Sequence, residues 1–183
     1  MAAGGFVYHL VPPKIFGEVL IPLNVLKLRN HELYSAAIKK YEGREFLMDE
    51  IICPLNCLWN DVLHFSTIDP CLIFAELDRL GLMQTQEWKV FKVSASLLDV
   101  RETTIYSPFY PEEGAFKVRP EDFCPFEPSK YQEMRELNSA SKRYFKEVKE
   151  QAGRALLFKY IPHVLFRGEL NIQGLEMVVW KKS

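Results

Sequence analysis

Glycine is scarce in this 183-residue chain, and none of its nine glycines belongs to a phosphate-binding loop. No GxGxxG or GxxxxGK[ST] pattern is present, which excludes the common dinucleotide and P-loop motifs. The GxSxG elbow of hydrolases and the HExxH helix of zinc peptidases are also missing. Function therefore has to be sought in residues that no single short motif brings together.

Long hydrophobic runs and an excess of one charge are missing as well. No stretch approaches the roughly 18 apolar residues of a membrane span, and the first residues lack the charged flank and apolar run of a signal peptide. The 23 Lys and Arg nearly balance the 24 Asp and Glu, so no global field favours nucleic acid. We therefore expect a cytoplasmic protein without a membrane partner.

Cysteine is limited to four residues, Cys53, Cys57, Cys71 and Cys124. The spacing of Cys53 and Cys57 occurs in some zinc sites, but no second Cys or His pair follows at a suitable distance. We expect reduced thiols that pack as small apolar side chains, and no metal site.

Apolar side chains are abundant enough for a hydrophobic core. Hydrophobic residues make up 48% of the chain and aromatic residues 13%, which argues against disorder over most of its length. The length fits one domain better than two. The chain is therefore expected to form a single domain over residues 1–183.

Periodicity and turn signals predict a mixed α+β domain rather than a doubly wound α/β fold. The run 6–11 is rich in β-branched and aromatic residues and stops at Pro12-Pro13, while Asp69, Pro70 and Gly81 mark the ends of a helix. We expect helices over 31–42, 69–81 and 131–151. Strands are expected over 6–11, 88–98, 155–161, 163–167 and 175–180, with turns or bulges at Gly168 and Gly174. The segment 101–129 should form a long irregular connection.

Three of the four histidines lie in apolar, strand-like runs near a turn. His9 follows Tyr8, His64 precedes Phe65-Ser66-Thr67, and His163 follows Pro162. A single histidine in such a setting is most often a hydrogen-bonded core residue. Three together shift the balance towards a shared site, with Asp61 as a further candidate beside His64.

The ordered blocks Tyr8-His9, 63–67 and 162–170 resemble the ADP-ribosyltransferase-like superfamily. The resemblance is greatest to its small bacterial domains of unknown function, and looser to its DNA-modifying toxins and to RNA 2′-phosphotransferases. It implies two small, mostly antiparallel sheets that form a cleft, with flanking helices, and NAD bound in that cleft.

The resemblance also implies roles for individual residues. His9 would bind a ribose hydroxyl, His64, Ser66 and Thr67 would line the second wall, and Tyr8 or Phe65 would offer aromatic surface.

The last block departs from the family pattern, because His163 stands where the toxins place a catalytic glutamate. The nearest acid is Glu169. If the turn at Gly168 directed its side chain to the cleft, Glu169 would act as the catalytic carboxylate. Otherwise it is an exposed charged residue of the hairpin. His163 could serve as a base. Arg167 could bind pyrophosphate or lie on the surface.

The expected function is an NAD-binding protein that transfers ADP-ribose to an unknown protein or nucleic-acid acceptor. The alternative is a catalytically inactive nucleotide- or protein-binding module on the same fold, which the departure at His163 favours. A structural or inhibitory partner protein without a small ligand is a third possibility.

Overall fold

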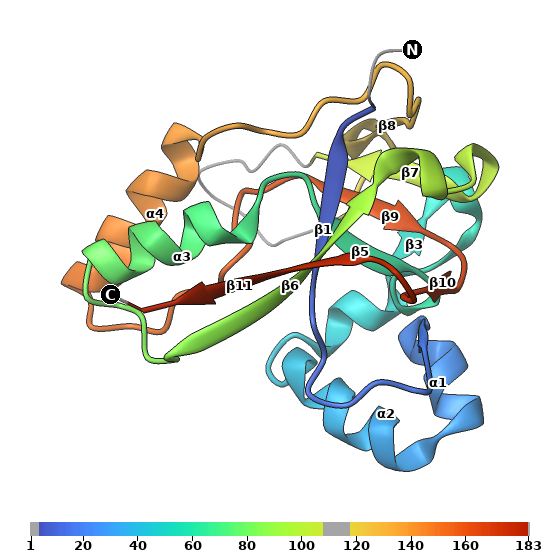
Figure 1. Ribbon diagram of the computed structural model, residues 1–183, viewed down its shortest axis with the longest axis horizontal. Helices are drawn as coiled ribbons and strands as arrows, with labels where there is room; N and C mark the ends of the chain where they lie inside the picture. Colours follow the sequence, from blue (N-terminus) through green and yellow to red (C-terminus); the bar gives the residue numbers. More distant parts are fainter. Residues whose placement is uncertain (1–3, 108–117, 183) are drawn as a thin grey trace.

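The computed structural model has a seven-stranded antiparallel sheet at its centre and describes residues 4–107 and 118–182 (Figure 1). Its order is β11-β6-β1-β5-β9-β7-β8. The strands are β1 (Phe6–Leu10), β5 (Leu63–Ser66), β6 (Glu87–Ser94), β7 (Thr103–Tyr106), β8 (Phe123–Pro125), β9 (His163–Phe166) and β11 (Glu176–Lys181). The prediction of a mixed α+β architecture is confirmed.

Short ribbons and helices complete the fold. Two ribbons pair β2 (Val19–Leu20) with β10 (Leu170–Asn171), and β3 (Ile51–Ile52) with β4 (Cys57–Leu58). The α-helices are α1 (Leu23–Arg29), α2 (His31–Ala37), α3 (Pro70–Arg79) and α4 (Ser139–Glu150). Short 3-10 helices include Ile38–Tyr41 and Trp59–Asp61. Among the described residues, no helix has the length and apolar character that crossing a bilayer requires.

The central sheet is nearly divided where β1 meets β5. These strands share only the pair Tyr8↔Ser66, whereas β1 pairs with β6 along its whole length and β5 does the same with β9. We call this junction the seam. The expectation of two separate small sheets is therefore corrected, because the seam joins a three-stranded half and a four-stranded half into one sheet.

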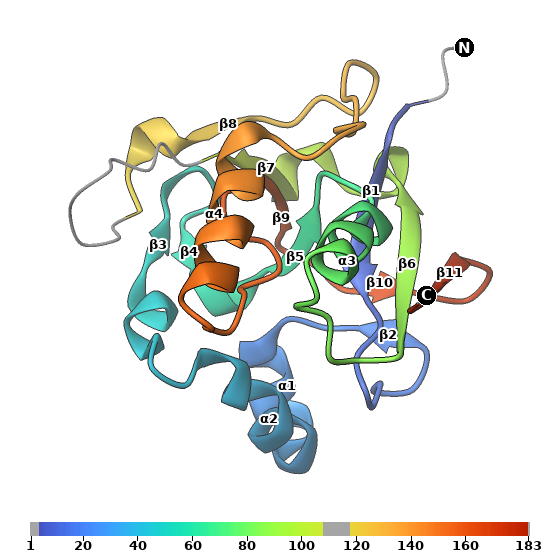
Figure 2. The same cartoon turned by 90° about the vertical axis from the view of Figure 1, so that its left-hand side faces the viewer.

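Helices α3 and α4 cover one face of the sheet, and α1 and α2 lie together at the end remote from the N-terminus (Figures 1 and 2). The first pair buries Phe74 and Phe145 in a cluster with Tyr8. The second pair belongs to a different cluster, which contains Leu23 and Tyr41. A third cluster around Phe65 lies between β1, β5 and β6.

The predicted helix after Asp69 is confirmed, with its end signals in place. The Asp69 carboxylate accepts a hydrogen bond of 2.9 Å from the backbone N–H of Cys71, and Pro70 occupies the first helical position. Gly81 follows with a φ of +75°, which glycine adopts without a Cβ clash. The strand predicted over 6–11 is confirmed as β1, and α2 continues into the 3-10 turn Ile38–Tyr41 within the predicted 31–42.

The helix predicted over 131–151 is wrong in its first part, because α4 begins only at Ser139. Met134 instead lies beside Ile68, and its N–H donates to the Thr67 carbonyl at 2.7 Å. Tertiary pairing thus outweighs the helical periodicity of this segment. Asn138 then caps α4 by accepting a hydrogen bond from the Ser141 N–H.

Two further expectations need correction. The connection 101–129 is not wholly irregular, since its described residues include β7 and β8 at one edge of the sheet; residues 108–117 lie outside the described part. The segment 155–161 forms turns rather than a strand. Tyr160, within it, has a φ of +65°, and β9 begins three residues later. Gly174 is a turn residue with a φ of +72°.

Candidate functional site

A cavity of about 610 Å³ opens beside the seam. Its lining includes the end of β1 and the chain that follows it as far as Leu26, residues of α2 and of the 3-10 turn after it, and residues of β5. Most of its wall is aliphatic, with Val11, Ile15, Leu20, Leu26 and Val62 among the lining residues. Three histidines, His9, His64 and His163, are among its polar lining residues, and we call it the histidine pocket.

His9, His64 and His163 reach this pocket from three strands, β1, β5 and β9. Ser66 lines it as well. The ladder of β5 and β9 explains part of this arrangement, because Ser66 pairs with His163 and His64 lies two residues before Ser66, on the same face. The structure therefore brings together four of the residues that the sequence singled out.

Each imidazole donates a hydrogen bond to a backbone carbonyl near it. His9 Nδ1 lies 2.6 Å from the Leu10 oxygen, and His64 Nε2 lies 2.9 Å from the Trp59 oxygen. His163 bonds to the backbone of Ile161. A carbonyl can only accept, so the bonded ring nitrogen of each histidine carries its proton.

The three histidines are neutral near pH 7. Burial lowers the pKa of His9 and His163 to about 4 and lowers that of His64 well below its usual value. The Lys40 ammonium adds to the effect on His9 and His64. Because each neutral ring has one N–H, already bonded, its second nitrogen remains a hydrogen-bond acceptor.

Lys40 brings a positive charge to the rim of the pocket. It follows α2 in the 3-10 turn Ile38–Tyr41, and its Nζ lies 5.1 Å from the centroid of the Tyr41 ring. Desolvation and the nearby Arg44 lower the pKa of Lys40. The residue is nevertheless exposed to water.

Asn60 is the pocket residue that the sequence analysis did not select. It is only 3% exposed, yet it lines the pocket, and its Oδ1 has no hydrogen-bond partner among the described residues. Trp88, another lining residue, has a buried indole N–H that likewise lacks a partner there. Unsatisfied buried polar atoms are uncommon in folded proteins, and here two such residues border one cavity.

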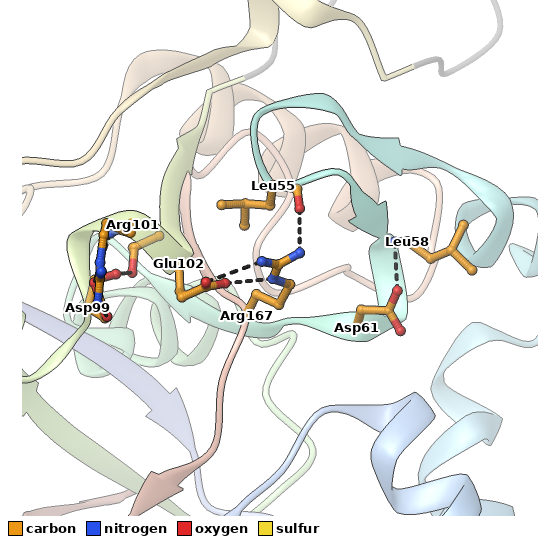
Figure 3. A network of polar contacts seen from close by, with 8 residues as sticks. Leu55, Leu58, Asp61, Asp99, Arg101, Glu102 and Arg167 are labelled. Carbon is orange, nitrogen blue, oxygen red and sulfur yellow. Dashed lines mark hydrogen bonds and ion pairs between the residues drawn. The ribbon is translucent and has the colours of Figure 1, made fainter.

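Asp61, considered as a wall of the cleft, has a structural role instead. Its Oδ2 accepts a hydrogen bond of 2.8 Å from the Leu58 N–H (Figure 3), and its Oδ1 accepts one of 2.7 Å from Asn24. These bonds fix the 3-10 turn Trp59–Asp61 and connect it to α1. They thereby hold the backbone that carries Asn60.

The two charged residues predicted in the last block lie away from the pocket. Arg167 forms a two-point ion pair with Glu102, at 2.6 and 3.2 Å, and also donates to the Leu55 carbonyl (Figure 3). Glu169 forms an exposed ion pair with Arg29 at 2.6 Å. Among the described residues, no Asp or Glu lines the pocket, so the site as it stands has no carboxylate for catalysis.

Tyr8, Phe65 and Thr67 also lie outside the lining. Tyr8 packs in the cluster under α3, on the opposite face of β1 from His9. Phe65 is fully buried but meets the edge of the His9 ring, with centroids 5.5 Å apart. The Thr67 hydroxyl donates to the Pro162 carbonyl at 2.9 Å and connects β5 to the start of β9.

Metal chemistry has no evident site in the part of the chain that the structure describes. No group of three or more His, Cys, Asp or Glu side chains there is arranged to hold an ion. The cysteines that the sequence placed four apart, Cys53 and Cys57, are free thiols, as are the other two. Comparison of the chain with protein-family models, with curated proteins and with solved structures gives no match.

Proposed function

We propose that this chain is an ADP-ribosyltransferase-like domain that binds NAD or a related nucleotide in the histidine pocket, as a binding module without transferase activity. The observation that carries the proposal is the convergence of His9, His64 and His163, from three distant segments, on one cavity. Histidines buried separately in the core would have supported no such site.

The arrangement of the sheet supports the proposal. A cleft between two small sheets is what the family resemblance implies, and the seam, with its single pair Tyr8↔Ser66, leaves the two halves of this sheet free to diverge beside the pocket. This supports the ADP-ribosyltransferase-like fold only indirectly, through the position of the cavity relative to the strands.

The pocket surface suits the parts of a nucleotide. Aliphatic walls can enclose a planar ring, since binding sites are typically apolar surfaces with a few polar groups that fix orientation. The acceptor nitrogens of the neutral imidazoles can receive hydrogen bonds from sugar hydroxyls. Lys40 at the rim can pair with a phosphate oxygen.

The lack of an Asp or Glu among the described residues that line the pocket is the reason for proposing binding rather than transfer. Cleavage of the bond to nicotinamide develops positive charge, which a carboxylate stabilises. Neutral imidazoles do not supply that negative charge. The exposed Glu169 would have to leave Arg29 to approach the reaction centre. Transfer of ADP-ribose is the second candidate, favoured by the joint placement of His9, His64, Ser66 and His163.

Calorimetric titration with NAD tests the proposal. The wild type should bind, and His9→Ala should bind about tenfold more weakly because an acceptor for the sugar is lost. His31→Ala is the matched control, since His31 is an exposed residue outside the pocket lining. No heat of binding with the folded wild type would refute the proposal.

Transfer is tested separately, by incubating the protein with labelled NAD and cell lysate and measuring nicotinamide release and labelled products. We expect neither above background. Release that is lost in Glu169→Gln but kept in Glu32→Gln, a second exposed ion-paired glutamate, would establish the transferase instead.

A further inference from the structure

The unpartnered carboxamide of Asn60 narrows the chemistry of the ligand. Its Oδ1 is buried without a hydrogen-bond partner, although the turn around it is well bonded. Asn60 has no side-chain hydrogen bond to another described residue through its nitrogen either, and oxygen and nitrogen of an amide can exchange places by rotation. The residue therefore has one donor end and one acceptor end, neither of which is bonded to another described side chain or backbone group.

Two other polar lining residues, His64 and Ser66, already use their protons as donors. His64 gives its proton to the Trp59 carbonyl, the residue directly before Asn60. The Ser66 hydroxyl donates to the Ile68 carbonyl at 2.7 Å. The second nitrogen of His64 remains an acceptor on the pocket wall, whereas the indole N–H of Trp88 is a donor without a partner among the described residues.

We propose that Asn60 is a specificity-determining residue, which selects a flat, uncharged ring bearing an NH₂ group, as in a primary carboxamide or an amino-heterocycle. Such a group has donors for the unsatisfied acceptors and, next to them, an acceptor for the amide nitrogen of Asn60, which allows a two-point contact. The aliphatic walls exclude water around the ring and strengthen these bonds. The inference refines the proposed function, because NAD carries both kinds of group, but it does not depend on the whole nucleotide being bound.

Asn60→Leu separates this role from a structural one. Leucine has a similar size and leaves no buried polar atom without a partner, so the variant should unfold at the same temperature as the wild type or higher. Removing a structural hydrogen bond would instead lower that temperature. Asn60→Asp is a second variant, which keeps the side-chain shape but replaces the NH₂ with an oxygen.

The test compares nicotinamide with methyl nicotinate, which has the same ring but no N–H donor, by NMR titration of ¹⁵N-labelled protein. We expect the wild type to bind nicotinamide roughly tenfold more tightly than methyl nicotinate. The side-chain NH₂ signals of Asn60 are identified by their absence from the spectrum of Asn60→Leu, and they should shift when nicotinamide binds. Asn60→Leu should reduce the preference to less than about twofold, whereas Asn60→Asp should retain it, because the carboxylate still accepts a hydrogen bond from the NH₂ group.

Four results would overturn the inference: no preference in the wild type, no binding of either compound, a preference that survives in Asn60→Leu, or a loss of preference that accompanies a marked fall in its unfolding temperature. Preference for nicotinamide without any binding of NAD would refute the proposed function and leave the role of Asn60 intact.

Discussion

The imidazole rings of His64 and His163 meet edge to face, with their centroids 6.4 Å apart, on the neighbouring strands β5 and β9. They are neutral because burial disfavours a charge on either ring, and at His64 the nearby Lys40 and His163 add to this effect. The three imidazoles thus make the pocket wall polar without adding charge to it. Its response to pH follows from that property.

Stability should fall as the pH is lowered from about 6.5 towards 4. His9 and His163 have an ordinary pKa of 6.5 and a pKa of about 4 in the folded protein, so in this interval the unfolded chain binds more protons than the folded one. Below about pH 4 the folded histidines also become protonated and their contribution to the decline levels off. Urea unfolding measured between pH 7 and 4 checks this.

His163→Gln should make that decline less steep, because one of the groups that take up a proton on unfolding is removed. His31→Gln, outside the pocket, serves as the control. A wild-type stability that is constant from pH 6.5 to 4 would contradict the neutral state of the pocket.

Replacing Lys40 should weaken binding only of ligands that carry phosphate. Lys40→Gln removes the positive charge at the rim, so the affinity for NAD should fall roughly five- to tenfold while that for nicotinamide stays the same. Lys39→Gln is the matched control, since Lys39 is the neighbouring residue, is exposed and does not line the pocket. Equal losses for NAD and nicotinamide would show that Lys40 acts on the pocket as a whole rather than on a phosphate.

Asn138→Ala should destabilise the fold by about 1–2 kcal/mol, since it removes the cap of α4. The same side chain also donates to the Tyr160 carbonyl at 2.8 Å, so the loss should lie at the upper end of that range. Chemical denaturation measures the change. Asn138→Asp keeps the capping oxygen and should restore most of the stability, which would not happen if α4 were held by packing alone.

The Arg29–Glu169 ion pair should contribute little. Both side chains are exposed, at 45% and 40%, and water screens such pairs effectively. Glu169→Gln is therefore expected to leave the unfolding midpoint and the affinity for NAD almost unchanged. A large effect on NAD binding would place Glu169 nearer to the ligand than the structure does.

Local signals in the sequence predicted the elements that are stabilised locally. Asp69, Pro70 and Gly81 define α3 through capping and turn geometry, and the run before Pro12 defines β1. The segment around Met134 has helical periodicity, but its backbone is paired with Thr67, more than sixty residues away in the chain. No nearby residue signals that contact.

The histidines of the candidate site could be singled out from the sequence, whereas Asn60 could not. Histidines in apolar runs are conspicuous, and the pocket brings His9, His64 and His163 together. Asn60 gives no such signal, because an Asn-Asp pair after a tryptophan is typical of an ordinary turn. Its importance depends on its burial and on its missing hydrogen bond, which only the folded structure reveals.

The seam also bears on how the domain can adapt to what it binds. Since only the Tyr8↔Ser66 pair connects β1 to β5, a change in the angle between the two halves would leave every other ladder in the sheet intact, although it would have to repack the cluster around Phe65 that spans them. Widening or narrowing the cavity in this way costs few hydrogen bonds. A ligand that contacts both halves of the sheet would fix the angle between them. Ligands of different sizes would therefore favour different angles.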